Sequence, residues 1–286
     1  MINKKQLSIL VLLILSANLF SENLKQVTYA SWDKPDVELF YYLPKTINQD
    51  TGVLFIIHGA SRDAERYIKI WENNIVDKNV ILIAPKFSKD SFPNYALLEM
   101  ATSSGKVKKD ETKYLTNSLS VFFTYFKNKY NLGTDLYSIY GFSGGSQFTH
   151  RYLMYSNDQR LHKAAIGSAG WYTFINNDPF PYGTQNMLID EDRLEWLLRS
   201  RILFLLGEQD TDPNHATLNS SNGAINQGSN RYERGKNYFD NMIHISKKNN
   251  LPFRWRYKLV KDVDHNMDNM TYHAMEFLLD DFEYIY

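Results

Sequence analysis

Short apolar runs that alternate with helical stretches constrain the fold of this chain more than any other feature. Several runs are apolar almost throughout, which is typical of strands buried on both faces of a parallel sheet. The alternation predicts an α/β fold with a mostly parallel, doubly wound sheet and helices on both faces. The expected strands are 37–43, 52–59, 80–85, 136–143, 163–170, 202–208 and 253–260, and the expected helices lie near 63–77, 112–130, 146–156, 231–249 and 268–284.

Two segments do not fit the alternation and are predicted to be loops. Residues 86–111 and 176–190 are rich in turn-forming residues with aromatic residues between them. Ligands of open α/β sheets bind at the carboxyl ends of the strands, where such loops gather. We therefore expect both segments to border the functional site.

Length and charge limit the organisation and the partners of the chain. Its 286 residues, 43% of them hydrophobic, suit one large domain, which we place at 22–286. Lys and Arg total 32, as do Asp and Glu, so the formal net charge is zero. This balance argues against nucleic acid as a partner and favours neutral molecules. Nothing in the sequence indicates an oligomeric state.

The first 21 residues have the pattern of a secretory signal peptide. Lys4 and Lys5 precede an apolar run at 8–15, and small residues follow it. A buried helix or a membrane anchor is the alternative, but a bilayer span needs about 20 apolar residues. We expect export to the periplasm or the exterior, without stable membrane insertion once the signal is removed. The chain has no cysteine, which excludes disulfides and metal–thiolate sites.

The segment Gly141-Phe142-Ser143-Gly144-Gly145 fits the pattern G-x-S-x-G between an expected strand and an expected helix. This context is that of a nucleophile elbow, in which a sharp turn projects the serine hydroxyl above the sheet. Glycines relieve crowding in such a turn, and the amide of Gly144 at the start of the helix is free to face an oxyanion. The alternative is a glycine-rich turn without chemistry, so the downstream sequence has to supply partners.

A serine nucleophile needs a histidine base, and the histidine needs an acceptor that fixes its tautomer. Asp210 follows the expected strand 202–208, and His265 lies in a polar loop after the last expected strand. The order Ser143, Asp210, His265 is that of α/β-hydrolases. The sequence therefore predicts these three residues as a catalytic triad.

Other residues compete for these roles. Asp212 is the alternative acid, but it stands in a turn before Pro213, whereas Asp210 ends the strand more directly. Asp262 and Asp264 are interpreted as solvated loop charges. His150 and His162 fall on or beside the helix of the elbow and are interpreted as structural, whereas His215, His244 and His273 lack the position at a strand end.

The second oxyanion donor is expected in the loop after the strand 52–59. His58-Gly59 has the position of the HG motif of esterases, which assigns the donated amide to Ala60, with Ser61 as the alternative. His58 itself is interpreted as a structural hydrogen-bonding residue.

These motifs resemble the serine esterases of the α/β-hydrolase superfamily, with closest similarity to poly(3-hydroxybutyrate) depolymerase-like and feruloyl-esterase-like secreted hydrolases. The resemblance implies nucleophile Ser143, acid Asp210, base His265 and oxyanion amides from Ala60 and Gly144. It extends over nearly the whole mature chain. The segments that carry it are 58–71, 83–93, 141–153, 168–173, 180–183, 205–213, 226–235 and 264–267.

The chain departs from the secreted depolymerases in having no cysteine and no room for a polymer-binding domain. Soluble esters or short polyester oligomers are therefore the expected substrates. Four aromatic residues are candidates for the acyl pocket, with aromatic packing beneath the loops as the alternative interpretation: Trp171, Tyr172, Phe180 and Tyr182.

No cofactor and no metal ion are expected. His273 and Glu276 share a helical face, but two such residues without a third ligand do not make a metal site. A peptidase or a thioesterase would use the same triad as an esterase. From a different class, a non-catalytic binding protein with a hydrolase fold would use an aromatic cleft to hold a sugar or a protein.

Overall fold

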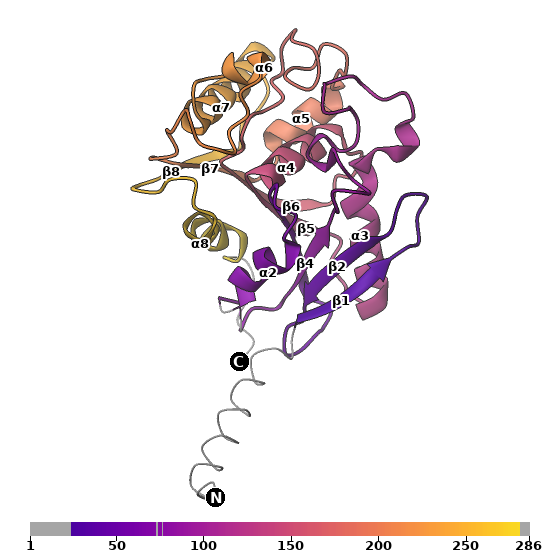
Figure 1. Ribbon diagram of the computed structural model, residues 1–286. Coiled ribbons are helices and arrows are strands. Elements are labelled where there is room, and N and C mark those ends of the chain that lie inside the picture. Colours follow the sequence, from indigo (N-terminus) through magenta and orange to yellow (C-terminus); the bar gives the residue numbers. More distant parts are fainter. Residues whose placement is uncertain (1–23, 73, 76, 281–286) are drawn as a thin grey trace, which may run out of the picture.

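The computed structural model describes residues 24–72, 74–75 and 77–280, and it contains one eight-stranded sheet (Figure 1). The strand order is β1-β2-β4-β3-β5-β6-β7-β8. The strands are β1 (Leu24–Tyr29), β2 (Val37–Tyr42), β3 (Gly52–Ile57), β4 (Val80–Lys86), β5 (Tyr137–Phe142), β6 (Leu161–Gly167), β7 (Ile202–Gly207) and β8 (Arg256–Val260). The expected signal peptide lies outside the described residues.

Six of the strands run parallel to one another, from β4 across the sheet to β8. The antiparallel pairs lie at one edge, where β2 pairs with both β1 and β4. Because parallel strands end at the same edge, the loops that follow β3, β5, β7 and β8 gather on one side. The mostly parallel sheet confirms the expected fold class.

Helices cover both faces of the sheet (Figure 1). On one face lie α2 (Ala64–Glu72) and α8 (Met267–Leu278). The other face carries α3 (Ser118–Tyr130), α4 (Gly144–Tyr155), α5 (Glu191–Arg199) and α7 (Arg231–Lys248), and a single turn, α6 (Asn222–Ile225), precedes α7.

The strands in the middle of the sheet supply the core from both of their faces. In β3, Val53, Phe55 and Ile57 belong to the core cluster that includes residues of α3 and α4, whereas Leu54 and Ile56 belong to the cluster that includes residues of α2 and α8. All of β3, β5 and β7 is buried, which explains why these segments are apolar runs rather than alternating ones. A buried side chain of this size contributes about 1.5–3 kcal/mol. The central strands thus form a rigid base for the loops at their ends.

Three elements were not expected from the sequence, namely β1, α5 and the single turn α6. β1 is an edge strand with a mostly exposed surface, and α5 follows directly after the loop that includes 176–190. Apart from Lys86, the last residue of β4, that loop and the segment 86–111 contain no strand or α-helix, as expected, although η1 (Tyr95–Leu97) forms one short turn of 3-10 helix and η2 (Glu111–Lys113) begins at its end. Among the described residues, no helix is both long and apolar enough to span a bilayer.

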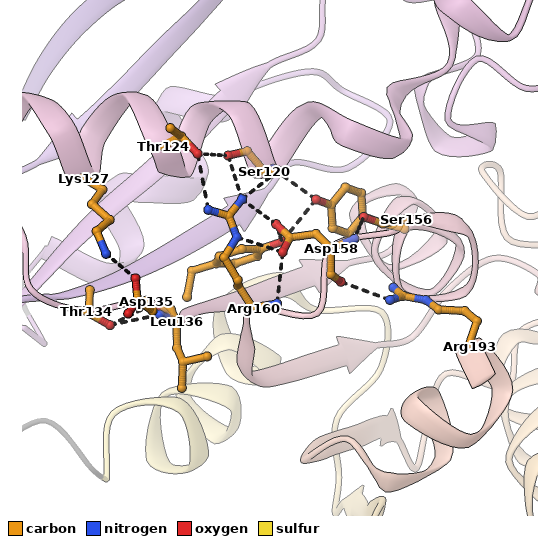
Figure 2. Close-up of polar contacts among 12 residues, drawn as sticks. Ser120, Thr124, Lys127, Thr134, Asp135, Leu136, Ser156, Asp158, Arg160 and Arg193 are labelled. Atoms are coloured by element: carbon orange, nitrogen blue, oxygen red, sulfur yellow. Dashed lines mark hydrogen bonds and ion pairs between the residues drawn. The ribbon is translucent and has the colours of Figure 1, made fainter.

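A half-buried polar cluster joins the elements at the amino end of β6 (Figure 2). Asp158 accepts two hydrogen bonds from the Arg160 guanidinium at 2.9 Å and one from the Tyr137 hydroxyl at 2.9 Å. Arg160 also donates to the Ser120 hydroxyl on α3, at 2.7 Å, and Arg193 on α5 donates to the Asp158 carbonyl at 3.0 Å. The cluster thereby ties α3, α5 and β5 together at the edge of the sheet opposite the candidate site.

Candidate active site

Ser143 stands at the corner between β5 and α4 in a backbone conformation that L-residues rarely adopt. Its φ is 55° and its ψ is −117°. The two flanking glycines are required by close approach: a Cβ at Gly145 would overlap the carbonyl of Ile57, and one at Gly141 would overlap the Thr149 hydroxyl. The G-x-S-x-G pattern therefore has a steric basis in this turn.

The structure brings Ser143, Asp210 and His265 together although the serine and the histidine are 122 positions apart in the sequence. The Ser143 hydroxyl lies 3.0 Å from His265 Nε2, in position to donate a hydrogen bond. Nδ1 of His265 lies 2.7 Å from Asp210 Oδ2. With Nδ1 as the donor to the carboxylate, Nε2 is left as the acceptor for the serine proton.

The loops that carry the acid and the base support each other. Gln209 donates its amide to the Val263 carbonyl at 2.8 Å, so the loops after β7 and β8 are joined beside the site. Gly207 permits this approach, because a Cβ there would lie 2.5 Å from the Val263 carbonyl oxygen. The Phe142 ring stacks on His265 with a centroid distance of 4.8 Å, which fixes the plane of the imidazole.

The competing carboxylates lie elsewhere. Asp212 is exposed and accepts the amide of Asn214 at 2.8 Å, as expected of a turn residue. Asp262 and Asp264 are exposed, whereas Asp210 is buried. Only Asp210 among these four aspartates bonds to the imidazole.

The turn after β3 lies beside the start of α4. The Ala60 amide nitrogen would be 3.0 Å from a Cβ built on Gly144, so the main chains of these two residues are in close contact. Gly144 is the first residue of α4 and its amide has no intrahelical acceptor. His58 is buried, donates from Nδ1 to the Gly59 carbonyl at 2.9 Å and accepts the Phe87 amide at Nε2 at 3.0 Å. Burial lowers the pKa of His58 to about 4, so the ring is neutral and holds the turn in place.

Arg62 fastens the same turn to the segment 87–93. Its guanidinium stacks on the Tyr95 ring at 3.9 Å, and the Tyr95 hydroxyl donates to the His58 carbonyl at 2.8 Å. The guanidinium also donates to three main-chain carbonyls at 2.6–3.1 Å, namely those of Phe87, Phe92 and Pro93. These contacts hold the Ala60 amide at a fixed distance from the elbow.

The electrostatics of the site keep His265 unprotonated near neutral pH. Burial is the largest cause of a lowered pKa for this histidine, and the hydrogen bond and charge of Asp210 act in the opposite direction. The positive charge of Arg231 and the neighbouring ring of His215 lower the pKa further. A neutral imidazole is the form that can take a proton from serine.

The four aromatic candidates occupy three different environments. Trp171 is nearly buried between the Arg151 guanidinium, 4.2 Å from its ring centroid, and the Tyr182 ring at 4.7 Å. Tyr172 is entirely buried, stacks on Tyr238 at 4.6 Å and accepts the Ala169 amide at its hydroxyl. It therefore supports the loop from below.

Phe180 and Tyr182 line a cavity of about 480 Å³ between the loop 176–190 and the segment before α7. Amide side chains line its other wall, among them Asn226 and Asn237. No triad residue contributes to this lining. The cavity is thus a neighbour of the Trp171–Tyr182 pair and separate from the serine itself.

Two residues of the site were not anticipated from the sequence. Arg62 directly follows the expected oxyanion turn, so its position in the sequence could have indicated a residue that holds this turn in place. Arg231 opens the long helix α7 and lies against Asp210, a contact that no local pattern encodes. His273, by contrast, pairs at 3.6 Å with Glu276, whose carboxylate also accepts from Lys258.

Comparison with known proteins gives matches at the level of structure. No family model matches the chain, and no curated protein sequence matches it significantly. Poly(aspartic acid) hydrolase-1 from Sphingomonas sp. KT-1 superposes with a TM-score of 0.84 and 27% identity, covering 90% of this chain and 98% of that one. LpqC, a poly(3-hydroxybutyrate) depolymerase from Bordetella parapertussis, gives 0.82 and 22%, covering 94% of each chain.

A more distant match extends the same picture. The S-formylglutathione hydrolase FrmB from Staphylococcus aureus has a TM-score of 0.56 and 14% identity, covering 90% of this chain and 98% of that one. At such identities the likeness concerns the fold. The arrangement of sheet and helices is therefore one that hydrolases of several kinds share.

Proposed function

We propose that this chain, which has the α/β-hydrolase fold, is an exported serine hydrolase that cleaves carboxylic esters through an acyl-enzyme. The observation that carries the proposal is the continuous hydrogen-bond chain from the Ser143 hydroxyl through His265 to Asp210. A glycine-rich turn with a purely structural role does not require a serine in a strained backbone conformation beside a neutral histidine. A non-catalytic binding role leaves the same arrangement without an explanation.

In the acylation step, Ser143 Oγ attacks the ester carbonyl and its proton passes to His265 Nε2. Asp210 stabilises the imidazolium that forms and holds the ring in the productive orientation. The carbonyl oxygen becomes an oxyanion, for which the amides of Ala60 and Gly144 are the proposed donors. When the intermediate collapses, the carbon–oxygen bond of the leaving alcohol breaks and His265 returns the proton to the alcohol. The acyl group remains on Ser143.

Deacylation repeats these steps with water as the nucleophile. His265 accepts a proton from water, the hydroxide adds to the acyl carbonyl, and the bond to Ser143 Oγ breaks. The proton returns to the serine and a carboxylic acid leaves. Each cycle therefore consumes one water and releases one alcohol and one acid, with no cofactor in any step.

Soluble esters or short oligomers are the proposed substrates. Trp171 and Tyr182 are the proposed contacts for the acyl group, because they form a continuous aromatic pair beside the cavity between α7 and the loop 176–190. Phe180 is nearly buried in the wall of that cavity, so its proposed role is to shape the wall. Tyr172 has no exposed area, and its proposed role is indirect.

A fluorophosphonate probe tests the proposal directly, because its reaction needs an activated serine. We expect the wild-type protein to be labelled at Ser143 and to hydrolyse p-nitrophenyl esters in a panel of varied acyl length. The His265→Asn variant should be neither labelled nor active. A folded wild-type protein that resists the probe and all esters would refute the proposal and favour a binding function.

Hydrolysis of amides is a second candidate, since the same triad serves peptidases. The observation in its favour is the similarity to a poly(aspartic acid) hydrolase, whose named polymer has units joined by amide bonds. Matched p-nitrophenyl ester and p-nitroanilide substrates with one acyl group distinguish the two. Turnover of the anilide at a rate comparable to the ester would favour the amide function.

A further inference from the structure

Arg231, the first residue of α7, lies against the carboxylate that bonds to His265. Its Nη1 is 3.5 Å from Asp210 Oδ1, and the two side chains are 2% and 5% exposed. The other oxygen, Oδ2, is the one that accepts from His265. Asp210 is therefore placed between an imidazole on one side and a guanidinium on the other.

The guanidinium of Arg231 has few other partners. Its Nη2 donates to the Thr217 hydroxyl at 2.8 Å and lies 3.4 Å from His215 Nδ1. Within the described part of the chain, Nε and Nη1 have no hydrogen-bond acceptor. A buried cation is costly unless an opposite charge compensates it. Among the described residues, Asp210 supplies the ion pair that does so.

The main chain of α7 is tied to the same aspartate. The Tyr232 amide donates to the Asp210 carbonyl at 3.1 Å, and the Asn230 side chain caps the helix by accepting the Glu233 amide. The positive end of the helix dipole thus lies beside Asp210 as well. The Arg231 side chain and the Tyr232 amide together fix the position of Asp210.

We propose that Arg231 is a positioning residue that holds Asp210 in place and opposes protonation of His265. The inference rests on the proposed function, in which His265 is the base. It can be tested without turnover, however, because it concerns the charge state of the His265 imidazole.

The groups that face His265 from each neighbouring element define this charge balance. Asp210, after β7, favours the imidazolium, whereas Arg231, from α7, and the His215 ring, 5.7 Å away by centroids, oppose it. Phe142 stacks on the ring without charge, and Asp264 is its exposed neighbour in sequence. Removal of the Arg231 charge leaves Asp210 unopposed, so the pKa of His265 should rise.

An NMR titration of the histidine side chains measures this pKa whether or not the protein is active. The signal of His265, one of seven histidines, is assigned with the His265→Asn variant. In Arg231→Gln we expect the pKa of His265 to rise by about 0.5–1 pH unit. In Arg231→Lys, which keeps the charge, it should stay near the wild-type value. The matched control is Arg234→Gln, which removes another buried arginine of α7 that bonds to the Gly170 and Gly228 carbonyls.

The same variants are then compared in the pH profile of kcat/KM for a p-nitrophenyl ester. The acidic limb of the profile should move to higher pH in Arg231→Gln and should keep its wild-type position in Arg231→Lys and Arg234→Gln. An unchanged His265 pKa in Arg231→Gln would overturn the proposal and leave Arg231 a packing residue. If that variant fails to fold, Arg231→Lys decides, because a large shift in a variant that retains the charge contradicts the proposal. An inactive wild-type protein with the expected titration would refute the proposed function alone.

Discussion

Ser143 is the residue on which the proposed chemistry depends, so its removal should abolish turnover and leave the fold in place. We expect Ser143→Ala to lower kcat by about 10³-fold or more, because no other hydroxyl in the described part of the chain lies against His265. Ester assays and circular dichroism would be compared with those of Ser146→Ala. Ser146 is a buried serine of α4, the helix that follows Ser143, and its hydroxyl has no partner among the described residues, so this control should stay active. Near-wild-type kcat in Ser143→Ala would place the nucleophile elsewhere.

The acid of the triad is tested by two isosteric substitutions. Asp210→Asn should lower kcat by about 10⁴-fold, because an amide cannot stabilise the imidazolium or fix its tautomer in the same way. Asp212→Asn should have a much smaller effect, since Asp212 is exposed and accepts from Asn214. Steady-state kinetics of both variants with one ester decide the assignment. A large loss of kcat in Asp212→Asn, with little loss in Asp210→Asn, would instead identify Asp212 as the acid.

The three triad residues were predictable because each has a local signature. Ser143 is surrounded by glycines at a strand end, and Asp210 and His265 each follow a strand in the expected order. Arg231 and Tyr172 carry no such signature. Their roles come from burial and from partners that are distant in sequence, which only tertiary packing brings together.

At the scale of elements, the turn after β3 and the segment 87–93 behave as one unit because Arg62 joins them. We expect Arg62→Met to lower kcat by about 10- to 100-fold with little change in KM, because a displaced Ala60 amide weakens the transition state more than substrate binding. Arg66→Met, at an exposed position of α2, is the matched control. An effect of Arg62→Met confined to KM would show that the residue contacts substrate instead.

The central strands were predictable as apolar runs because both of their faces are buried. β1 was missed since its sequence, LKQVTY, mixes polar and apolar residues at an exposed edge. The helix α5 was missed although Asp190 caps it by accepting the Arg193 amide at 2.7 Å. It is only nine residues long and follows a long loop, so its apolar positions make up only part of the window of about 11–18 residues in which a helical period is recognised.

At the scale of the whole molecule, the cluster around Asp158 should make stability depend on pH. Burial alone would raise the pKa of Asp158, but the hydrogen bonds from Arg160 and Tyr137 outweigh it and the pKa is lowered. The stabilisation is therefore present above the unfolded value of about 3.9 and is lost as the pH falls through the lower folded value.

The Asp158→Asn variant measures this contribution. We expect the free energy of unfolding at neutral pH to fall by about 1–3 kcal/mol, and the difference from wild type to narrow in acid. Urea unfolding at several pH values gives both quantities. Asp135→Asn is the control, because Asp135 is exposed beside Lys127 in the same region, and it should leave stability unchanged (Figure 2). A difference that stays constant at all pH values would contradict the expected loss of stability in acid.

Export also concerns the molecule as a whole. Residues 1–21 lie outside the described residues, and the proposal rests on Lys4, Lys5 and the apolar run that follows. We expect the mature protein to begin near residue 22 when its first residues are determined from the periplasm or the medium. Protein that retains Met1 in the cytoplasm would refute export.

The backbone of Ser143 has a further consequence for how the sequence can change over time. A non-glycine residue with φ of 55° and ψ of −117° costs about 1–3 kcal/mol, a cost that glycine largely avoids. The substitution Ser143→Gly should therefore raise the melting temperature while it abolishes turnover. Stability and catalysis therefore favour different residues at this position, and selection for stability alone would favour the inactive glycine variant.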